Sequence, residues 1–197
     1  PPKPMLDRLA LNEGRIHSMA EGLRKVAGLP DPVGEVIGGG TAASGLRITK
    51  RRVPLGVVGI IYEARPNVTS DAMGLCLKTG NGVILKGGSE AVASNAAIAR
   101  IMTEAGISRG LPEDAVCFVS DTSRECVNEM MKMNGLIDVL IPRGGSGLIQ
   151  AVVRGATVPV IETGVGNCHI FVDETADFDM AVNIIMNAKT QRIGVCN

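Results

Sequence analysis

From residue 53 onward the chain alternates between short apolar runs and longer segments whose apolar residues recur at helical spacing. The short runs are apolar on both faces, which is typical of strands buried between two layers of helices. Several longer segments begin at a residue that can cap a helix, such as Ser70, Ser89 or Asp177. Strands are predicted over 53–62, 82–86, 115–119, 137–142, 158–161 and 169–173, and helices over 70–79, 90–105, 123–133, 146–155 and 177–188.

This order of elements predicts an α/β fold with three layers, in which a mainly parallel sheet lies between helices on both faces. Right-handed crossovers bring the carboxyl ends of all the strands to one edge of the sheet. Ligands of open α/β sheets usually bind at that edge. Polar residues that directly follow a predicted strand are therefore the first candidates for a functional site.

The first 52 residues follow a different pattern. Residues 4–29 have helical spacing, 29–45 are rich in Pro and Gly, and 46–52 contain four basic residues. We interpret 46–52 as an edge strand whose charges oppose pairing with another sheet, with an anion-binding patch as the alternative. The predicted organisation is a segment of helix, linker and basic edge strand over 1–52, followed by one α/β domain over 53–197.

Composition limits the classes of partner. Acidic and basic residues balance at 20 each, so no overall field attracts nucleic acid or a membrane, and one Tyr, three Phe and no Trp are too few for base stacking. The sequence has no evident signal peptide and no apolar run long enough to cross a bilayer. Five scattered cysteines without a C-x-x-C pair favour a reducing compartment over disulfides or a zinc site. We expect a cytoplasmic protein without a metal.

Familiar motifs of nucleotide and hydrolase sites are absent. Neither G-x-G-x-x-G nor G-x-x-x-x-G-K-[ST] occurs, although glycine clusters are present. G-x-S-x-G is also missing, and the only histidines are His17 and His169, which argues against a Ser-His-Asp hydrolase or a histidine-rich metal site. A nucleotide would have to be bound by a different arrangement.

Four segments carry a family resemblance. PLGVVGIIYEARPNVTSDA and LKTGNGVILKGGSEA surround two predicted strand ends, LIPRGGSGL surrounds a third, and NAKTQRIGVCN ends with a cysteine after a glycine. These segments resemble the aldehyde dehydrogenase superfamily and, within it, the gamma-glutamyl phosphate reductases. The similarity runs from Met5 to Asn197. It implies the nucleotide-binding fold of that superfamily.

The resemblance also implies a reaction, the NADPH-dependent reduction of gamma-glutamyl phosphate to glutamate-5-semialdehyde and phosphate in proline biosynthesis. In it a thiolate attacks the acyl carbon, phosphate leaves, and hydride transfer reduces the resulting thioester. Cysteine suits this chemistry because its thiolate is a strong nucleophile. Cys196 matches the family's nucleophile. The alternative, a small buried hydrophobe, is our interpretation of the other four cysteines.

Two further positions match the family's catalytic and cofactor-binding residues. Asn67 matches the side-chain donor that, with the backbone N–H of Cys196, would stabilise the oxyanion, and the alternative is a turn residue after Pro66. Lys86 matches the lysine that contacts the adenosine ribose of NADP, with Ser89 as a second donor at the start of a helix. A solvated lysine is the alternative there.

The turn around Gly145 and Ser146 matches the glycine-serine turn that covers the cofactor pyrophosphate and nicotinamide. An ordinary strand-to-helix turn is the alternative. Arg65, Lys189 and Arg192 flank the catalytic segments, and we expect one or more of them to bind the substrate phosphate unless they pair with nearby acids.

Members of this family are longer than this chain. The resemblance therefore implies that a C-terminal catalytic domain after Asn197 is absent, and that the full-length protein is a homo-oligomer. Two other interpretations stay open. The chain is a nucleotide-binding module without turnover, or an aldehyde dehydrogenase for a different substrate.

Overall fold

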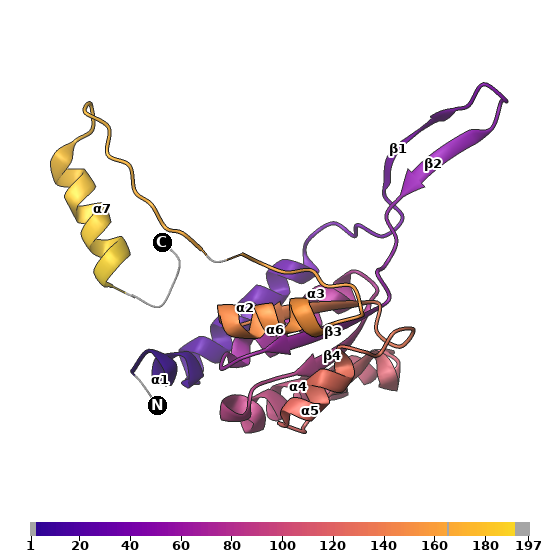
Figure 1. Cartoon of the computed structure of the whole chain (residues 1–197), viewed down its shortest axis with the longest axis horizontal. Helices are drawn as coiled ribbons and strands as arrows, with labels where there is room; N and C mark the ends of the chain where they lie inside the picture. The colour runs from indigo at the N-terminus through magenta and orange to yellow at the C-terminus, as the bar shows by residue number, and fades with distance from the viewer. Residues whose placement is uncertain (1–2, 165, 192–197) are drawn as a thin grey trace. The chain divides into compact units, whose positions relative to one another are not determined.

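The computed structural model describes residues 3–164 and 166–191, which form two compact units, one up to Thr163 and one from Gly164 onward (Figure 1). The second unit contains α7 (Phe178–Thr190), with Asp177 as its N-cap. The first unit contains α1 (Lys3–Leu9), α2 (Glu13–Ala27), β1 (Val36–Thr41), β2 (Arg47–Arg51), β3 (Val57–Tyr62), α3 (Pro66–Lys78), β4 (Gly82–Lys86), η1 (Ser89–Ala91), α4 (Val92–Ile107), η2 (Glu113–Ala115), β5 (Val116–Phe118), α5 (Arg124–Met130), β6 (Val139–Arg143) and α6 (Ser146–Gly155).

The main sheet has the strand order β5-β4-β3-β6, and every neighbouring pair is parallel. Val160 adds an isolated parallel bridge to Leu140, so the run predicted over 158–161 lies beyond β6 as a minimal strand. The chain passes from β3 to β4 to β5 and then returns to the other side of β3 with β6. The strand order therefore reverses between β3 and β6, and ligands of open α/β sheets bind in the crevice outside such a switch point.

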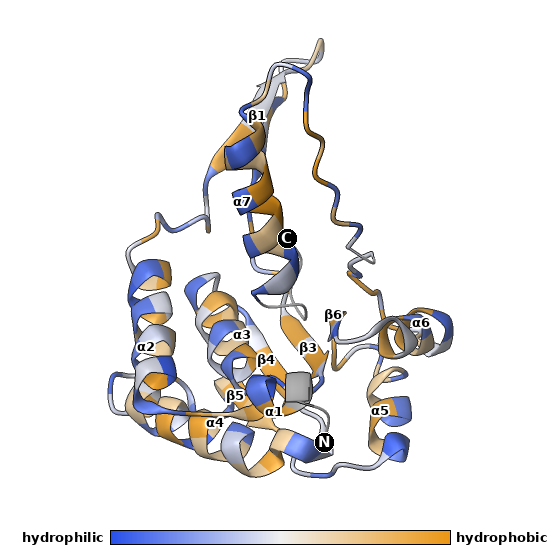
Figure 2. Cartoon of the chain, turned by 90° about the vertical axis from the view of Figure 1, so that its left-hand side faces the viewer, coloured by the Kyte–Doolittle hydropathy of each residue, from blue (hydrophilic) through white to orange (hydrophobic). Residues whose placement is uncertain are grey.

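Alternation along β3 builds the three layers. Val58 and Ile60 belong to one buried cluster together with Met73 of α3, whereas Ile61 belongs to a second cluster together with Val152 of α6. Successive side chains of a strand point to opposite faces of the sheet, so the two clusters lie on opposite sides of it. Figure 2 shows α3 and α4 on one side of the strands and α5 and α6 on the other. The predicted α/β fold with a parallel sheet is confirmed.

The segment predicted as a connection over 29–45 contains a strand, so that prediction is wrong. β1 pairs antiparallel with β2, and every residue of both strands is exposed. β1 contains three consecutive glycines, which have a low strand propensity. The strand is stabilised by its hydrogen-bonded pairing with β2 rather than by its own sequence. The basic segment over 46–52 is a strand as predicted, but it belongs to this separate hairpin.

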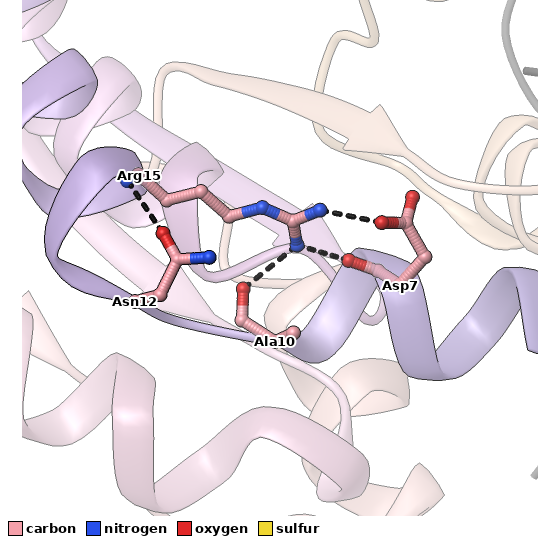
Figure 3. A network of polar contacts seen from close by, with 4 residues as sticks. All are labelled: Asp7, Ala10, Asn12 and Arg15. Carbon is pink, nitrogen blue, oxygen red and sulfur yellow. Dashed lines mark hydrogen bonds and ion pairs between the residues drawn. The ribbon is translucent and has the colours of Figure 1, made fainter.

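The N-terminal helix predicted over 4–29 is interrupted. Asn12 caps α2 by accepting a hydrogen bond from the Arg15 backbone N–H at 2.9 Å. The Arg15 guanidinium reaches back to the Ala10 carbonyl oxygen at 2.8 Å and to the Asp7 carboxylate, as Figure 3 shows. A capping residue thus starts a second helix, and one arginine ties its first turn to the end of α1.

Other predicted elements differ from the structure in their bounds or are absent, and β3 begins at Val57 rather than at residue 53. α3 begins at Pro66 rather than at residue 70, because proline fits the first turn of a helix, and the Arg65 side chain makes no capping bond that would mark the start. The run over 169–173 has no strand in the described structure, and Phe171 is 88% exposed. Among the described residues no strand pairs with this run, and an apolar sequence alone does not make a strand.

Gly56, the residue before β3, provides a test of the contact between Asp138 and the start of β3. Its φ is +116°, and a Cβ there would lie 2.0 Å from Oδ2 of Asp138, which accepts a hydrogen bond from the Val57 N–H at 2.7 Å. We therefore expect Gly56→Ala to lower the free energy of unfolding by about 2 kcal/mol. Urea denaturation measures this change.

Gly22 in α2 is the matched control, because a Cβ there meets nothing within 4 Å. Gly22→Ala should raise the free energy of unfolding by up to about 1 kcal/mol, since alanine favours a helix over glycine. Equal stability of Gly56→Ala and the parent chain would show that Asp138 does not fix the start of β3.

Candidate functional site

The carboxyl edge of the main sheet gathers the helix starts. α3, α4, α5 and α6 each follow one of the four parallel strands, so their N-termini lie at this edge. Register places Lys86 at the end of β4 beside Ile61 of β3, and Arg143 at the end of β6 beside Tyr62. The backbone N–H groups in the first turn of a helix have no acceptor within the helix. The edge therefore presents several groups of donors suited to an anionic ligand.

Lys86 is buried, with 3% of its surface exposed. Its Nζ donates a hydrogen bond to the carbonyl oxygen of Gly87 at 3.2 Å. The interpretation as an ordinary solvated lysine is therefore wrong. A buried amino group is costly unless it is hydrogen-bonded, and its position at the carboxyl end of a strand makes Lys86 a candidate for a ligand contact.

The turn after β4 packs tightly over a buried amide. Asn95 of α4 is 0% exposed, and neither polar atom of its side chain has a hydrogen-bond partner in the structure as described. A Cβ on Gly87 would lie 2.3 Å from Asn95 Nδ2, so only glycine lets the backbone approach this closely. A buried polar group without a partner calls for a water or ligand contact.

The loop after β5 brings an acidic group to the same edge. The Val119 N–H donates to the Leu85 carbonyl oxygen at 2.9 Å, which continues the β4–β5 pairing up to this loop. Hydrogen bonding from Ser123, whose backbone N–H lies 2.7 Å from Asp121 Oδ1, lowers the pKa of the Asp121 carboxyl, and the Lys86 charge adds a smaller effect.

Glu63 lies at the switch point between β3 and β6. Its Oε2 accepts a hydrogen bond from the Gly145 N–H at 2.8 Å, and its own N–H donates to the Arg143 carbonyl oxygen at 3.1 Å. A Cβ on Gly144 would lie 2.7 Å from the Glu63 carboxyl carbon. Sequence reasoning did not single out Glu63, although it directly follows a buried strand at the candidate edge.

Asn67 lies in the first turn of α3, not in a turn before the helix. Its side chain is exposed, and Nδ2 donates to Asp71 Oδ2 at 3.1 Å. Burial raises the pKa of the Asp71 carboxyl, and this hydrogen bond from Asn67 opposes the rise. Ser89 and Ser146 are the first residues of η1 and α6, and both are exposed.

The cations predicted to bind phosphate are only partly described. Arg65 is the N-cap of α3 and is half-buried, and Lys189 in α7 donates from Nζ to the Cys168 carbonyl oxygen at 3.0 Å. Arg192 lies outside the described residues, as does Cys196. The proposed cluster of phosphate ligands therefore stays a prediction.

Burial raises the pKa of two of the remaining cysteine thiols. Burial raises the pKa of the Cys76 thiol in α3 to about 11, so it is protonated at neutral pH. Burial also raises the pKa of the Cys126 thiol in α5, with a further contribution from the Asp121 carboxylate. The burial of Cys76 agrees with its interpretation as a small buried hydrophobe. That interpretation is wrong for Cys117, which is exposed on the edge strand β5.

The part of the chain that the structure describes has neither a metal-binding cluster nor a membrane-spanning helix. Among residues 3–164 and 166–191, no three His, Cys, Asp or Glu side chains group in a way that could hold a metal ion. In the same part of the chain, no helix combines the length and the apolar character needed to cross a bilayer.

Comparison with known proteins gives close relatives. The chain is 64% identical over 193 residues to the gamma-glutamyl phosphate reductase of Clostridium novyi, covering 98% of this chain and 46% of that protein. The crystal structure of the Thermotoga maritima gamma-glutamyl phosphate reductase superposes with a TM-score of 0.87 at 53% identity, over 98% of this chain and 46% of that one. The Saccharomyces cerevisiae enzyme of the same name gives a TM-score of 0.73 at 33% identity, over 96% of this chain and 48% of that one.

The chain thus spans about half the length of the relatives it matches. The model of the aldehyde dehydrogenase family matches residues 7–196, which cover most of both units and the whole sheet edge described above. Nearly the entire sequence is therefore accounted for by one family, and the chain belongs to the aldehyde dehydrogenase family.

Proposed function

We propose that this chain is the nucleotide-binding part of a gamma-glutamyl phosphate reductase, which reduces gamma-glutamyl phosphate to glutamate-5-semialdehyde and phosphate with NADPH. The identity of 64% over 98% of the chain to a relative of that name carries the proposal. The switch point between β3 and β6 agrees with it, because open α/β sheets bind nucleotides there.

The residues at the sheet edge fit a nicotinamide dinucleotide. The buried Lys86 ammonium, the amide of Asn95 without a partner and the close approach of Gly144 to Glu63 are features of a site built around a polar ligand. When bound, the cofactor supplies the hydride.

In this proposal Lys86 and Ser89 hold the adenosine ribose and its 2′-phosphate. Gly145 and Ser146 form the turn beside the pyrophosphate. The ammonium and the hydroxyl suit a phosphate ester because both donate hydrogen bonds to its oxygens.

The chemical step falls to two other residues of the chain. The Cys196 thiolate would attack the acyl carbon, so that the C–S bond forms as the bond to the phosphate oxygen breaks. The Asn67 amide would donate to the oxygen that becomes negative during this attack. Arg65, Lys189 and Arg192 are the proposed ligands of the departing phosphate.

The reverse reaction tests the proposal. The intact protein that carries this sequence should reduce NADP with glutamate-5-semialdehyde only when inorganic phosphate is present, because phosphate is the acceptor of the acyl group. Reduction that does not depend on phosphate would instead support an aldehyde dehydrogenase for another substrate. NADPH binding without turnover would support a nucleotide-binding module.

Replacement of Lys86 should weaken cofactor binding without lowering the stability of the chain. We expect Lys86→Met to weaken NADPH binding roughly 10- to 100-fold, because a hydrogen bond to a charged group is lost. The same change should leave the melting temperature equal or higher, because methionine fills similar space without a buried charge. Calorimetric titration and thermal unfolding measure the two effects.

Lys132 is the matched control, because it is exposed and follows the C-cap of α5, away from the helix starts. Lys132→Met should change neither quantity. Unaltered NADPH affinity in Lys86→Met would remove Lys86 from the proposed site.

A further inference from the structure

The exposed carboxylate at the switch point has a specific partner in the turn that opens α6. Glu63 follows β3 directly, and its Oε2 receives the Gly145 N–H at 2.8 Å although the two residues are 82 positions apart. Gly145 is also the N-cap of α6, and no side chain of Gly145 caps the helix, because glycine has none. The Glu63 carboxylate therefore supplies the cap from the neighbouring strand.

Gly144 allows this contact, and Gly88 lies close to Glu63 on the other side. A Cβ on Gly144 would lie 2.7 Å from the Glu63 carboxyl carbon, and one on Gly88 would lie 3.6 Å from the Glu63 Cα. Gly88 belongs to the turn after β4, and Gly144 belongs to the turn after β6. Glu63 thus lies between the two turns that flank β3, at the crevice where the strand order reverses.

We propose that Glu63 is a positioning residue that holds the turn of Arg143, Gly144 and Gly145 in the conformation that accepts the dinucleotide. The inference rests on the proposed function, since it concerns the cofactor site named there. One donor of the turn is taken by Glu63, because Gly145 gives its N–H to the carboxylate. Contact with the cofactor then falls to the groups that follow, the Ser146 hydroxyl and the free N–H groups of the first helical turn.

The acceptor, rather than the charge, is the feature that matters in this proposal. Glutamine presents a carbonyl oxygen at the same reach, whereas aspartate keeps the charge but is shorter by one methylene, and alanine lacks both. A carboxylate beside a pyrophosphate is electrostatically unfavourable, so a purely electrostatic role would make the loss of charge tighten binding.

Three variants separate these roles. Glu63→Ala and Glu63→Asp should each raise the Kd of this chain for NADPH about tenfold, whereas Glu63→Gln should stay within about threefold of the parent. In the absence of cofactor, residues 143–147 should exchange their amide hydrogens faster in the first two variants and at the parental rate in Glu63→Gln. Glu113→Ala, an exposed site in η2 before β5, is the control and should match the parent in both measurements.

The outcomes distinguish this inference from the proposed function. A parent chain that does not bind NADPH defeats the proposed function, while exchange in the turn still reports whether Glu63 holds it. A parent that binds NADPH, with equal affinity in Glu63→Ala, overturns the positioning role alone. Tighter binding in both Glu63→Ala and Glu63→Gln also overturns it, because the carboxylate would then compete with the cofactor.

Discussion

Replacement of Cys196 by serine in the intact protein is expected to lower turnover at least about a thousandfold while NADPH affinity stays unchanged. The reason is chemical, because a serine hydroxyl is a far weaker nucleophile near neutral pH than a cysteine thiolate. The phosphate-dependent reduction of NADP measures turnover, and calorimetric titration with NADPH measures affinity.

Cys117 provides the control, because it is an exposed free cysteine on β5. Cys117→Ser should retain full activity. Cys76 is a less suitable nucleophile, since burial raises the pKa of its thiol to about 11. Activity of Cys196→Ser within about tenfold of the parent would remove Cys196 as the nucleophile.

Replacement of Asn67 by alanine is expected to lower kcat about 10²- to 10³-fold with a smaller effect on KM. The lost amide would stabilise negative charge only as it develops on the acyl oxygen, and removal of one such donor has this magnitude in other acyl-transfer sites. Steady-state kinetics of the intact protein, with glutamate-5-semialdehyde, NADP and phosphate each varied, separates the two constants.

Asp71 distinguishes orientation from chemistry at this position. Its Oδ2 accepts the hydrogen bond from Asn67 Nδ2 at 3.1 Å, and Asp71→Asn keeps an oxygen that can accept it. That variant should keep kcat within about threefold of the parent. An unchanged kcat in Asn67→Ala would contradict the catalytic role, and Asn67 would then be only a residue in the first turn of α3.

Most of the main sheet could be predicted from the sequence because its strands are continuous apolar runs, of which β3 and β4 are buried or half-buried on both faces. The run over 82–86 matches β4 at both ends, and the runs around β5 and β6 differ from the structure by one or two residues at each end. Such strands are continuous in hydrophobicity, so a local pattern is sufficient. The start of α3 was missed because Pro66 opens the helix without a polar side-chain cap.

The β1–β2 hairpin could not be predicted in the same way. Its strands are exposed on both faces and rich in glycine or basic residues, so no burial pattern marks them. Their pairing is a contact between two segments, and a pattern within one segment does not contain it. The run over 169–173 fails for the converse reason, since it has the apolar composition of a strand but pairs with no strand in the described structure.

The sequence predicts those residues of the candidate site that lie in a recognisable motif of their own segment. Lys86 was placed at a strand end by its own segment, and the structure adds that it is buried. Glu63 was not found because its significance lies in a hydrogen bond to Gly145, which comes from a distant segment. Asn95 was likewise missed, because an asparagine in a helix carries no local sign that the backbone of Gly87 will pack onto it.

Hydrogen exchange of this chain with and without saturating NADPH tests most directly whether the carboxyl edge of the sheet binds the cofactor. We predict slower exchange in residues 86–92 and 143–148, which contain the two turns that flank β3, and no change in residues 36–51 of the hairpin. Slower exchange confined to the basic hairpin, or no change in either turn, would contradict this prediction. Slower exchange in the hairpin would indicate that the exposed basic residues of β2 bind the cofactor. No change in either turn would indicate that the carboxyl edge of the sheet does not bind it.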